Sequence, residues 1–151
     1  KSLFTIMEQI TPGPDTKIGD ILHISAESIK KRGLIIIISD FFDDLKSIVS
    51  GIKHYRYKGH EVILFHILDE EELNLNFNER TQFIDMETNE TITTDPWHIQ
   101  KDYKKEMERF CNDLQSHCRQ NKVDYTMLST NKPIELALFD YLLKRQKINL
   151  N

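Results

Sequence analysis

A surplus of positive charge and a long apolar run are both missing from this 151-residue sequence. Lysine and arginine number 20 against 24 aspartates and glutamates, which leaves a net charge of -4. Nucleic-acid-binding domains gather basic residues on one face, so we expect no nucleic-acid partner. The longest apolar run, 34–38, falls far short of the roughly 20 residues that cross a bilayer, and we expect no membrane contact. The length suits one compact domain.

Cysteine is scarce, and the two cysteines that occur cannot pair within a regular helix. Cys111 and Cys118 lie seven residues apart in a segment with helical periodicity. A rise of about 1.5 Å per residue separates their Cα atoms by about 10 Å, whereas a disulfide needs Cα atoms within about 7 Å. We therefore expect two reduced thiols packed on a helix face, and a cytoplasmic protein.

The sequence also lacks the short motifs that identify common enzymes and cofactor sites. Neither a Walker loop nor a GxGxxG fingerprint occurs, and neither cysteine sits in a nucleophile elbow. None of the six histidines has HExxH spacing or lies four residues from another histidine. His66 falls inside an apolar run and is predicted to be a buried histidine with satisfied hydrogen bonds. No motif therefore predicts a catalytic residue or a bound cofactor.

Apolar periodicity predicts helices and strands that alternate along the first half of the chain. Thr16 can cap a helix whose apolar side chains recur from Ile18 to Ile29. The β-branched run 34–39 is typical of a strand buried on both faces. An amphipathic helix follows between 42 and 52, and the apolar run 62–68 predicts a second strand. This order predicts two parallel strands joined by a right-handed crossover helix.

The second half of the chain continues this pattern after an interruption. Glu70–Glu72 resembles a solvated turn, and residues 82–86 and 91–93 alternate around a polar centre, which predicts an inserted β-hairpin. A long helix opens at Pro96, and 123–129 forms a third core strand. The last helix is predicted to start at Pro133 and to pack through Ile134, Ala137, Leu138, Tyr141 and Leu142. The predicted fold is an open, Rossmann-like α/β sheet with parallel core strands and flanking helices.

Acidic side chains gather where the predicted parallel strands end. Asp40, Asp43 and Asp44 follow strand 34–39, and Asp69 follows strand 62–68. Ligands in open α/β sheets bind at this edge, and metal-dependent hydrolases and nucleases place carboxylates there to hold ions. Alternatively, Asp43 and Asp44 stabilise the positive N-terminus of the following helix. The sequence alone leaves both interpretations open.

Four segments, taken in order, carry a resemblance to a bacterial family. The first, 32–44, joins Arg-Gly to a hydrophobic run and then to Ser-Asp-Phe-Phe-Asp-Asp. The others are Gly59–Val62 with His66–Asp69, then Phe83–Thr88, then Val123–Tyr125 leading to Leu128–Thr130, and the loop Pro12–Thr16 also fits. In order and spacing they resemble domain-of-unknown-function family 58, a von Willebrand factor A-like group.

The resemblance implies both a partner and a metal site. Members of that family are often encoded beside MoxR-type AAA+ ATPases and are thought to assist assembly or maturation of other complexes. A von Willebrand factor A site holds Mg²⁺ through an Asp-x-Ser-x-Ser loop, a Thr and an Asp; Thr16 and Asp40 match the last two. The Asp-x-Ser-x-Ser motif does not occur here, so we expect that the first strand and its loop lie upstream of Lys1. The remnant site is expected to hold no cofactor in this chain, with Mg²⁺ bound only in the intact protein.

These observations define the expected role of residues 1–151. We interpret them as the C-terminal part of one von Willebrand factor A-like domain, and as a non-enzymatic module that binds a MoxR-type AAA+ ATPase or a client protein. The alternatives are a metal-dependent hydrolase or nuclease built on Asp40, Asp43 and Asp44, and a structural scaffold whose hairpin, 81–94, contacts a partner. Strand 34–39 would have an open edge, which we expect a second copy to cover in a homodimer, or else the segment Ser2–Met7.

Overall fold

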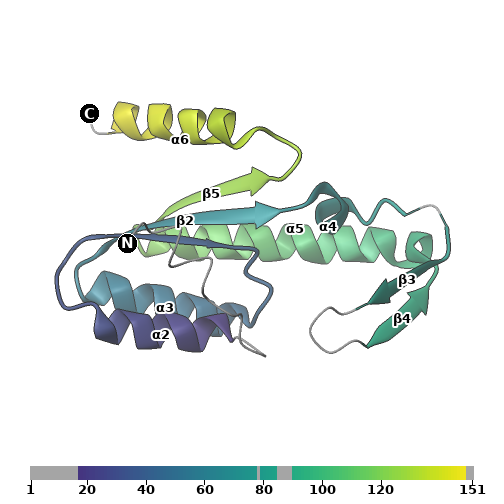
Figure 1. The fold of residues 1–151 in the computed structure, drawn as a ribbon, viewed down its shortest axis with the longest axis horizontal. Helices are drawn as coiled ribbons and strands as arrows, with labels where there is room; N and C mark the ends of the chain where they lie inside the picture. The colour runs from purple at the N-terminus through teal and green to yellow at the C-terminus, as the bar shows by residue number, and fades with distance from the viewer. Residues whose placement is uncertain (1–16, 78, 85–89, 149–151) are drawn as a thin grey trace, which may run out of the picture.

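The computed structural model describes residues 17–77, 79–84 and 90–148 as an α/β fold (Figure 1). The helices and strands follow one another in the order α2 (Ile18–Ser28), β1 (Leu34–Ser39), α3 (Leu45–Tyr57), β2 (Glu61–Leu68), α4 (Glu70–Asn74), β3 (Thr81–Ile84), β4 (Thr91–Thr94), α5 (Pro96–Gln120), β5 (Asp124–Ser129) and α6 (Ile134–Ile148). The predicted fold class is confirmed. The predicted cap Thr16 lies outside the described residues.

Three parallel strands form the sheet in the order β1-β2-β5. Leu34 of β1 pairs with Glu61 of β2, and Ile63 of β2 pairs with Asp124 of β5. The parallel arrangement and the neighbours predicted for each strand are therefore confirmed. The inserted hairpin is confirmed as well, because β3 and β4 pair antiparallel, and it lies at the far end of α5 from the sheet (Figure 1).

Helices cover the two faces of the sheet unequally (Figure 1). On one face α2, α3 and α5 pack against alternate side chains of the central strand, among them Val62 and Leu64. On the opposite face α6 packs through Tyr141 against Ile63 and Phe65. The central strand β2 is consequently buried on both faces, which explains its nearly continuous apolar sequence.

The face of β1 on the α6 side is open, and the prediction of burial on both faces is wrong for this strand. Leu34, Ile36 and Ile38 are 49%, 52% and 62% exposed, while the alternate residues Ile35 and Ile37 pack on the helical core. The cause lies in α6, which contacts β5 and β2 but leaves β1 uncovered within the described ranges. The packing predicted for α6 is also wrong in part, because Ile134, Leu138 and Leu142 are exposed.

Two glycines let α2 and α3 pack closely with their N-terminal ends side by side. A Cβ atom on Gly51 would lie 2.5 Å from the Cβ of Leu22, and one on Gly19 would lie 2.0 Å from the hydroxyl of Ser47. Each distance is too short for a real side chain, so these positions set how near the two helices come. None of the helices in the described ranges is long and apolar enough to cross a membrane.

Candidate functional site at the carboxyl ends of the strands

The three clustered aspartates lie in the loop between β1 and α3, where each binds local backbone. Asp44 is the N-cap of α3 and accepts a hydrogen bond from the Ser47 amide at 2.9 Å. Asp43 accepts from the Asp44 amide at 2.7 Å, and Asp40 accepts from the Phe42 amide at 3.4 Å. The helix-stabilising interpretation of Asp44 is therefore confirmed.

Asp43 also lies beside the first turn of α2. The pKa of its carboxyl is lowered mainly by the hydrogen bond from Asp44, although desolvation acts in the opposite direction. The amides of Gly19 and Ile18 at the start of α2 lower the pKa further, without forming hydrogen bonds of normal geometry. Its second oxygen, Oδ2, is buried and has no hydrogen-bond partner among the described residues. The Asp43 carboxylate thus lies near the positive N-terminal ends of both α2 and α3.

The second acidic position, Asp69, forms a separate structure where β2 ends. It caps α4 by accepting from the Glu71 amide at 2.9 Å, while Glu72 accepts from the Asp69 amide at 2.7 Å. Thr130, which follows β5, donates its hydroxyl to Asp69, and this bond is the main cause of the lowered pKa of that carboxyl. The predicted turn at Glu70–Glu72 is therefore a short helix, joined to the end of β5.

The structure does not bring Asp69 into the cluster of Asp40, Asp43 and Asp44. Asp69 binds the Glu71 amide and the Thr130 hydroxyl, whereas the three other aspartates bind the backbone of their own loop. Within the described ranges, no three His, Cys, Asp or Glu side chains converge in a way that could hold a metal ion. The carboxylates at this edge therefore divide into two capping groups.

His66 connects all three strands beneath this edge. Its ring is fully buried; Nε2 lies 2.8 Å from the Asp40 carbonyl oxygen, and Nδ1 lies 2.8 Å from the Tyr125 hydroxyl. A carbonyl can only accept, so Nε2 carries the proton and Nδ1 accepts from the tyrosine. Burial lowers the pKa of His66, which favours this neutral form. The prediction of a satisfied interior histidine is confirmed.

An apolar hollow of about 460 Å³ opens between the β1–α3 loop and α5. It is lined by Phe42, Tyr103, Glu106, Met107 and Phe110. Phe42 was expected to lie on the apolar face of the following helix, but it precedes α3 and is 48% exposed. Glu106 is the single charged residue in this lining, so the hollow suits an apolar group of another molecule.

Comparison with known proteins identifies the family. A family model described as protein of unknown function DUF58 matches residues 3–111, which is more than half of the chain. The chain belongs to the DUF58 family. The match contains the strand β1, the aspartate loop and the hairpin, whereas the resembling segment 123–130 lies beyond it. No curated protein and no solved structure matches this DUF58 chain significantly.

The expected Mg²⁺ site of this DUF58 chain rests on Thr16 and Asp40. Thr16 lies outside the described residues, and the Asp40 carboxylate accepts hydrogen bonds from Phe42 and from the Ser39 hydroxyl at 3.3 Å. Mg²⁺ prefers near-octahedral oxygen coordination. One carboxylate leaves nearly the whole shell to water, so the described residues alone do not fit a magnesium centre.

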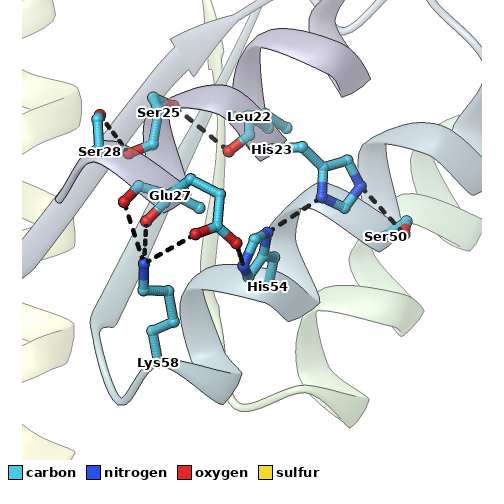
Figure 2. Close-up of polar contacts among 9 residues, drawn as sticks. Leu22, His23, Ser25, Glu27, Ser28, Ser50, His54 and Lys58 are labelled. Carbon is cyan, nitrogen blue, oxygen red and sulfur yellow. Dashed lines mark hydrogen bonds and ion pairs between the residues drawn. The ribbon is translucent and has the colours of Figure 1, made fainter. Parts of the chain in front are cut away.

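Sequence reasoning missed two features of DUF58 that the structure reveals. One is the apolar hollow. Its lining joins Phe42 to four residues of α5, and the nearest of these in sequence, Tyr103, is 61 residues away. The other is a polar cluster across α2 and α3, centred on His23 and His54 (Figure 2). Its signal was present as two spacings of four residues, His23 with Glu27 and Ser50 with His54, which place each pair on one helix face.

Proposed function

We propose that this DUF58 chain is a von Willebrand factor A-like binding module of the bacterial cytoplasm. Its partner in this proposal is a MoxR-type AAA+ ATPase, with which it acts in the assembly or maturation of other proteins. The partner class comes from the family resemblance. One structural observation supports a binding role: the apolar hollow beside Phe42, at the edge where open α/β sheets bind their ligands.

The composition of the hollow matches the centre of a protein interface. Aromatic residues and methionine are enriched at such centres, and Phe42, Tyr103, Met107 and Phe110 supply both kinds here. Phe42 projects from a loop, whereas the other three belong to the long helix α5. An apolar side chain of the partner can therefore enter between a loop and a helix, as anchoring residues of interfaces do.

Binding to a purified MoxR-type ATPase in the presence of ATP tests this proposal. Truncation of a hot-spot residue at the centre of an interface weakens binding by about 2 kcal/mol or more, so Phe42→Ala is expected to weaken the complex at least about tenfold. Tyr57→Ala is the matched control, because Tyr57 is an aromatic residue that is 91% exposed at the end of α3. Equal affinity of the two variants, or no complex with the unaltered chain, contradicts the proposal.

A further inference from the structure

Two histidines meet head to head on the surface formed by α2 and α3 (Figure 2). Nδ1 of His23 lies 3.1 Å from Nδ1 of His54, and the two rings are 5.3 Å apart at an angle of 43°. The close packing of the helices at Gly19 and Gly51 brings the rings into range. A larger residue at either position would push the two helices apart. The short distance between the two rings therefore depends on the close packing of α2 and α3.

The outer nitrogen of each ring has its own polar partner (Figure 2). Nε2 of His54 lies 2.9 Å from a carboxylate oxygen of Glu27, and Nε2 of His23 lies 3.2 Å from the hydroxyl of Ser50. The other carboxylate oxygen of Glu27 lies 3.7 Å from the ammonium nitrogen of Lys58. Lys58 also donates a hydrogen bond to the Ala26 carbonyl at 2.7 Å. Glu27 and Ser50 therefore orient the two rings through their Nε2 atoms, and the Nδ1 atoms of the two rings face each other.

The hydrogen-bond partners determine the protons on these rings. A carboxylate only accepts, so Nε2 of His54 carries a proton, and Nδ1 of the neutral ring has a free lone pair. In the neutral pair, His23 donates its Nδ1 proton to that lone pair, and its Nε2 accepts from Ser50. If the His23 proton moves to Nε2, Ser50 accepts instead of donating, and both Nδ1 lone pairs become free without net release of a proton.

We propose that Nδ1 of His23 and Nδ1 of His54 bind one late first-row divalent metal ion, Cu²⁺ more tightly than Zn²⁺. Imidazole nitrogens suit these ions, and the order of affinity follows the general trend for nitrogen ligands. Metal–nitrogen bonds of about 2.0–2.1 Å at angles between about 90° and 109° place two ligand nitrogens about 2.8–3.4 Å apart. The observed 3.1 Å falls within that interval. Because the two Nδ1 atoms face each other in the metal-free pair, both rings turn slightly on binding to direct their lone pairs at one ion.

Glu27 and Ser50 complete the arrangement around the two ligands. Metal-binding histidines donate their second N–H to a carboxylate, carbonyl or water, which fixes the tautomer and raises the basicity of the ligand. His54 has such an acceptor in Glu27, which is itself held by Lys58. The Ser50 hydroxyl takes the corresponding place beside His23 and can accept its Nε2 proton. Because no third His, Cys, Asp or Glu in the described ranges joins them, water fills the other coordination positions.

Titration of the full 151-residue chain with Cu²⁺ and Zn²⁺, followed by calorimetry, tests the site. We expect one ion per chain and no competition from Mg²⁺, which prefers oxygen ligands. His23→Ala and His54→Ala are each expected to remove this binding. Glu27→Gln keeps both ligands and should weaken binding about 10- to 100-fold, the usual effect of losing a partner of a metal-bound histidine.

His98→Ala is the matched control, because His98 is an exposed histidine at the start of α5, away from the pair. Its metal affinity should equal that of the unaltered chain. Electron paramagnetic resonance gives an independent readout: Cu²⁺ should show two nitrogen ligands in the unaltered chain and in Glu27→Gln. If an alanine variant fails to fold by circular dichroism, His23→Asn and His54→Gln replace it. The proposal is overturned if the unaltered chain binds no Cu²⁺, or if loss of either histidine leaves the affinity unchanged.

Discussion

At the scale of single residues, polar groups in this molecule stabilise places where elements meet. His66 is the clearest case, because its two ring nitrogens bind the Asp40 carbonyl after β1 and the Tyr125 hydroxyl on β5. Asp43 accepts a hydrogen bond from Asp44, the N-cap of α3, and also lies beside the first turn of α2. Replacing either residue should therefore affect stability, with a dependence on pH that follows from its ionisation.

His66→Phe retains an aromatic ring and removes both hydrogen bonds. The Asp40 carbonyl and the Tyr125 hydroxyl lose their partner in two part-buried hydrogen bonds, and a group left unsatisfied away from water costs about 1–3 kcal/mol. We expect a loss of about 2–4 kcal/mol in the free energy of unfolding, measured with urea at pH 8. His98→Phe should cost far less, because His98 is exposed.

The same variant should change the response to acid. Burial lowers the pKa of His66 in the folded state, so the unfolded chain takes up this proton first as the pH falls. The contribution of His66 is complete above its ordinary pKa of about 6.5 and decreases below it. Between pH 7 and pH 5, stability should fall less steeply in His66→Phe than in the unaltered chain. Parallel curves would show that His66 is not buried in its neutral form.

Asp43→Asn tests the second position. The pKa of Asp43 is lowered in the folded state, so its carboxylate stabilises the fold above the ordinary aspartate pKa of about 3.9 and less as the pH falls through the lowered value. The loss at pH 7 should stay below about 1 kcal/mol, as for other charges at helix ends. Thermal unfolding from pH 7 to pH 3 should show the difference shrinking as the pH falls below about 4, with Asp102→Asn as an exposed helical control. A difference of the same size at pH 7 and pH 3 would contradict an electrostatic role.

At the scale of elements, the contact between α2 and α3 depends on the absence of two side chains. Gly51→Ala adds a methyl group 2.5 Å from the Cβ of Leu22, which is not a flexible chain end. Overpacking costs about 1–3 kcal/mol, which exceeds the gain of up to about 1 kcal/mol from better helix propensity. We expect a lower unfolding midpoint for Gly51→Ala. Gly33→Ala is the control, because nothing lies within 4 Å of its added methyl group.

The open face and outer edge of β1 predict self-association. Only β2 pairs with β1 in the described part of the chain, and Leu34, Ile36 and Ile38 are about half exposed. Unpaired edges with apolar side chains attract another strand, and a twofold dimer satisfies both edges at once. Light scattering should therefore give a dimer for the unaltered chain and a monomer for Ile36→Lys. Ile92→Lys, on the exposed hairpin strand β4, should remain dimeric, and a monomeric unaltered chain would rule out this arrangement.

At the scale of the whole molecule, the two groups of carboxylates bear on the alternative of a metal-dependent hydrolase. Asp40, Asp43 and Asp44 bind their own loop, and Asp69 binds α4 and Thr130. We expect no turnover of phosphodiester or phosphomonoester substrates with Mn²⁺, and only weak binding of Mg²⁺ by calorimetry. Activity that disappears in Asp40→Asn would establish the hydrolase instead.

The sequence predicted the parts of this fold that depend on local pattern. The apolar runs located β1, β2 and β5, and Asp43 and Asp44 were predicted at the N-terminus of the following helix, where Asp44 is the cap. It could not predict the open face of β1, because a run of isoleucines looks the same whether one face or both are covered. Nor could it predict the pairing of His23 with His54, since their distance depends on how closely α2 approaches α3. The hollow beside Phe42 likewise requires the position of α5 relative to a distant loop.

The sequence separation between paired strands of the sheet bears on the order in which the chain folds. Paired residues of β1 and β2, such as Leu34 and Glu61, are close in sequence, whereas β2 reaches β5 only across the hairpin and α5. Closing the longer loop costs more chain entropy, by about 0.6 kcal/mol for each doubling of its length. During synthesis β1, α3 and β2 leave the ribosome well before β5 does. We therefore expect the nascent chain to form its aspartate loop and its pair of histidines first, before β5 pairs with the other edge of β2.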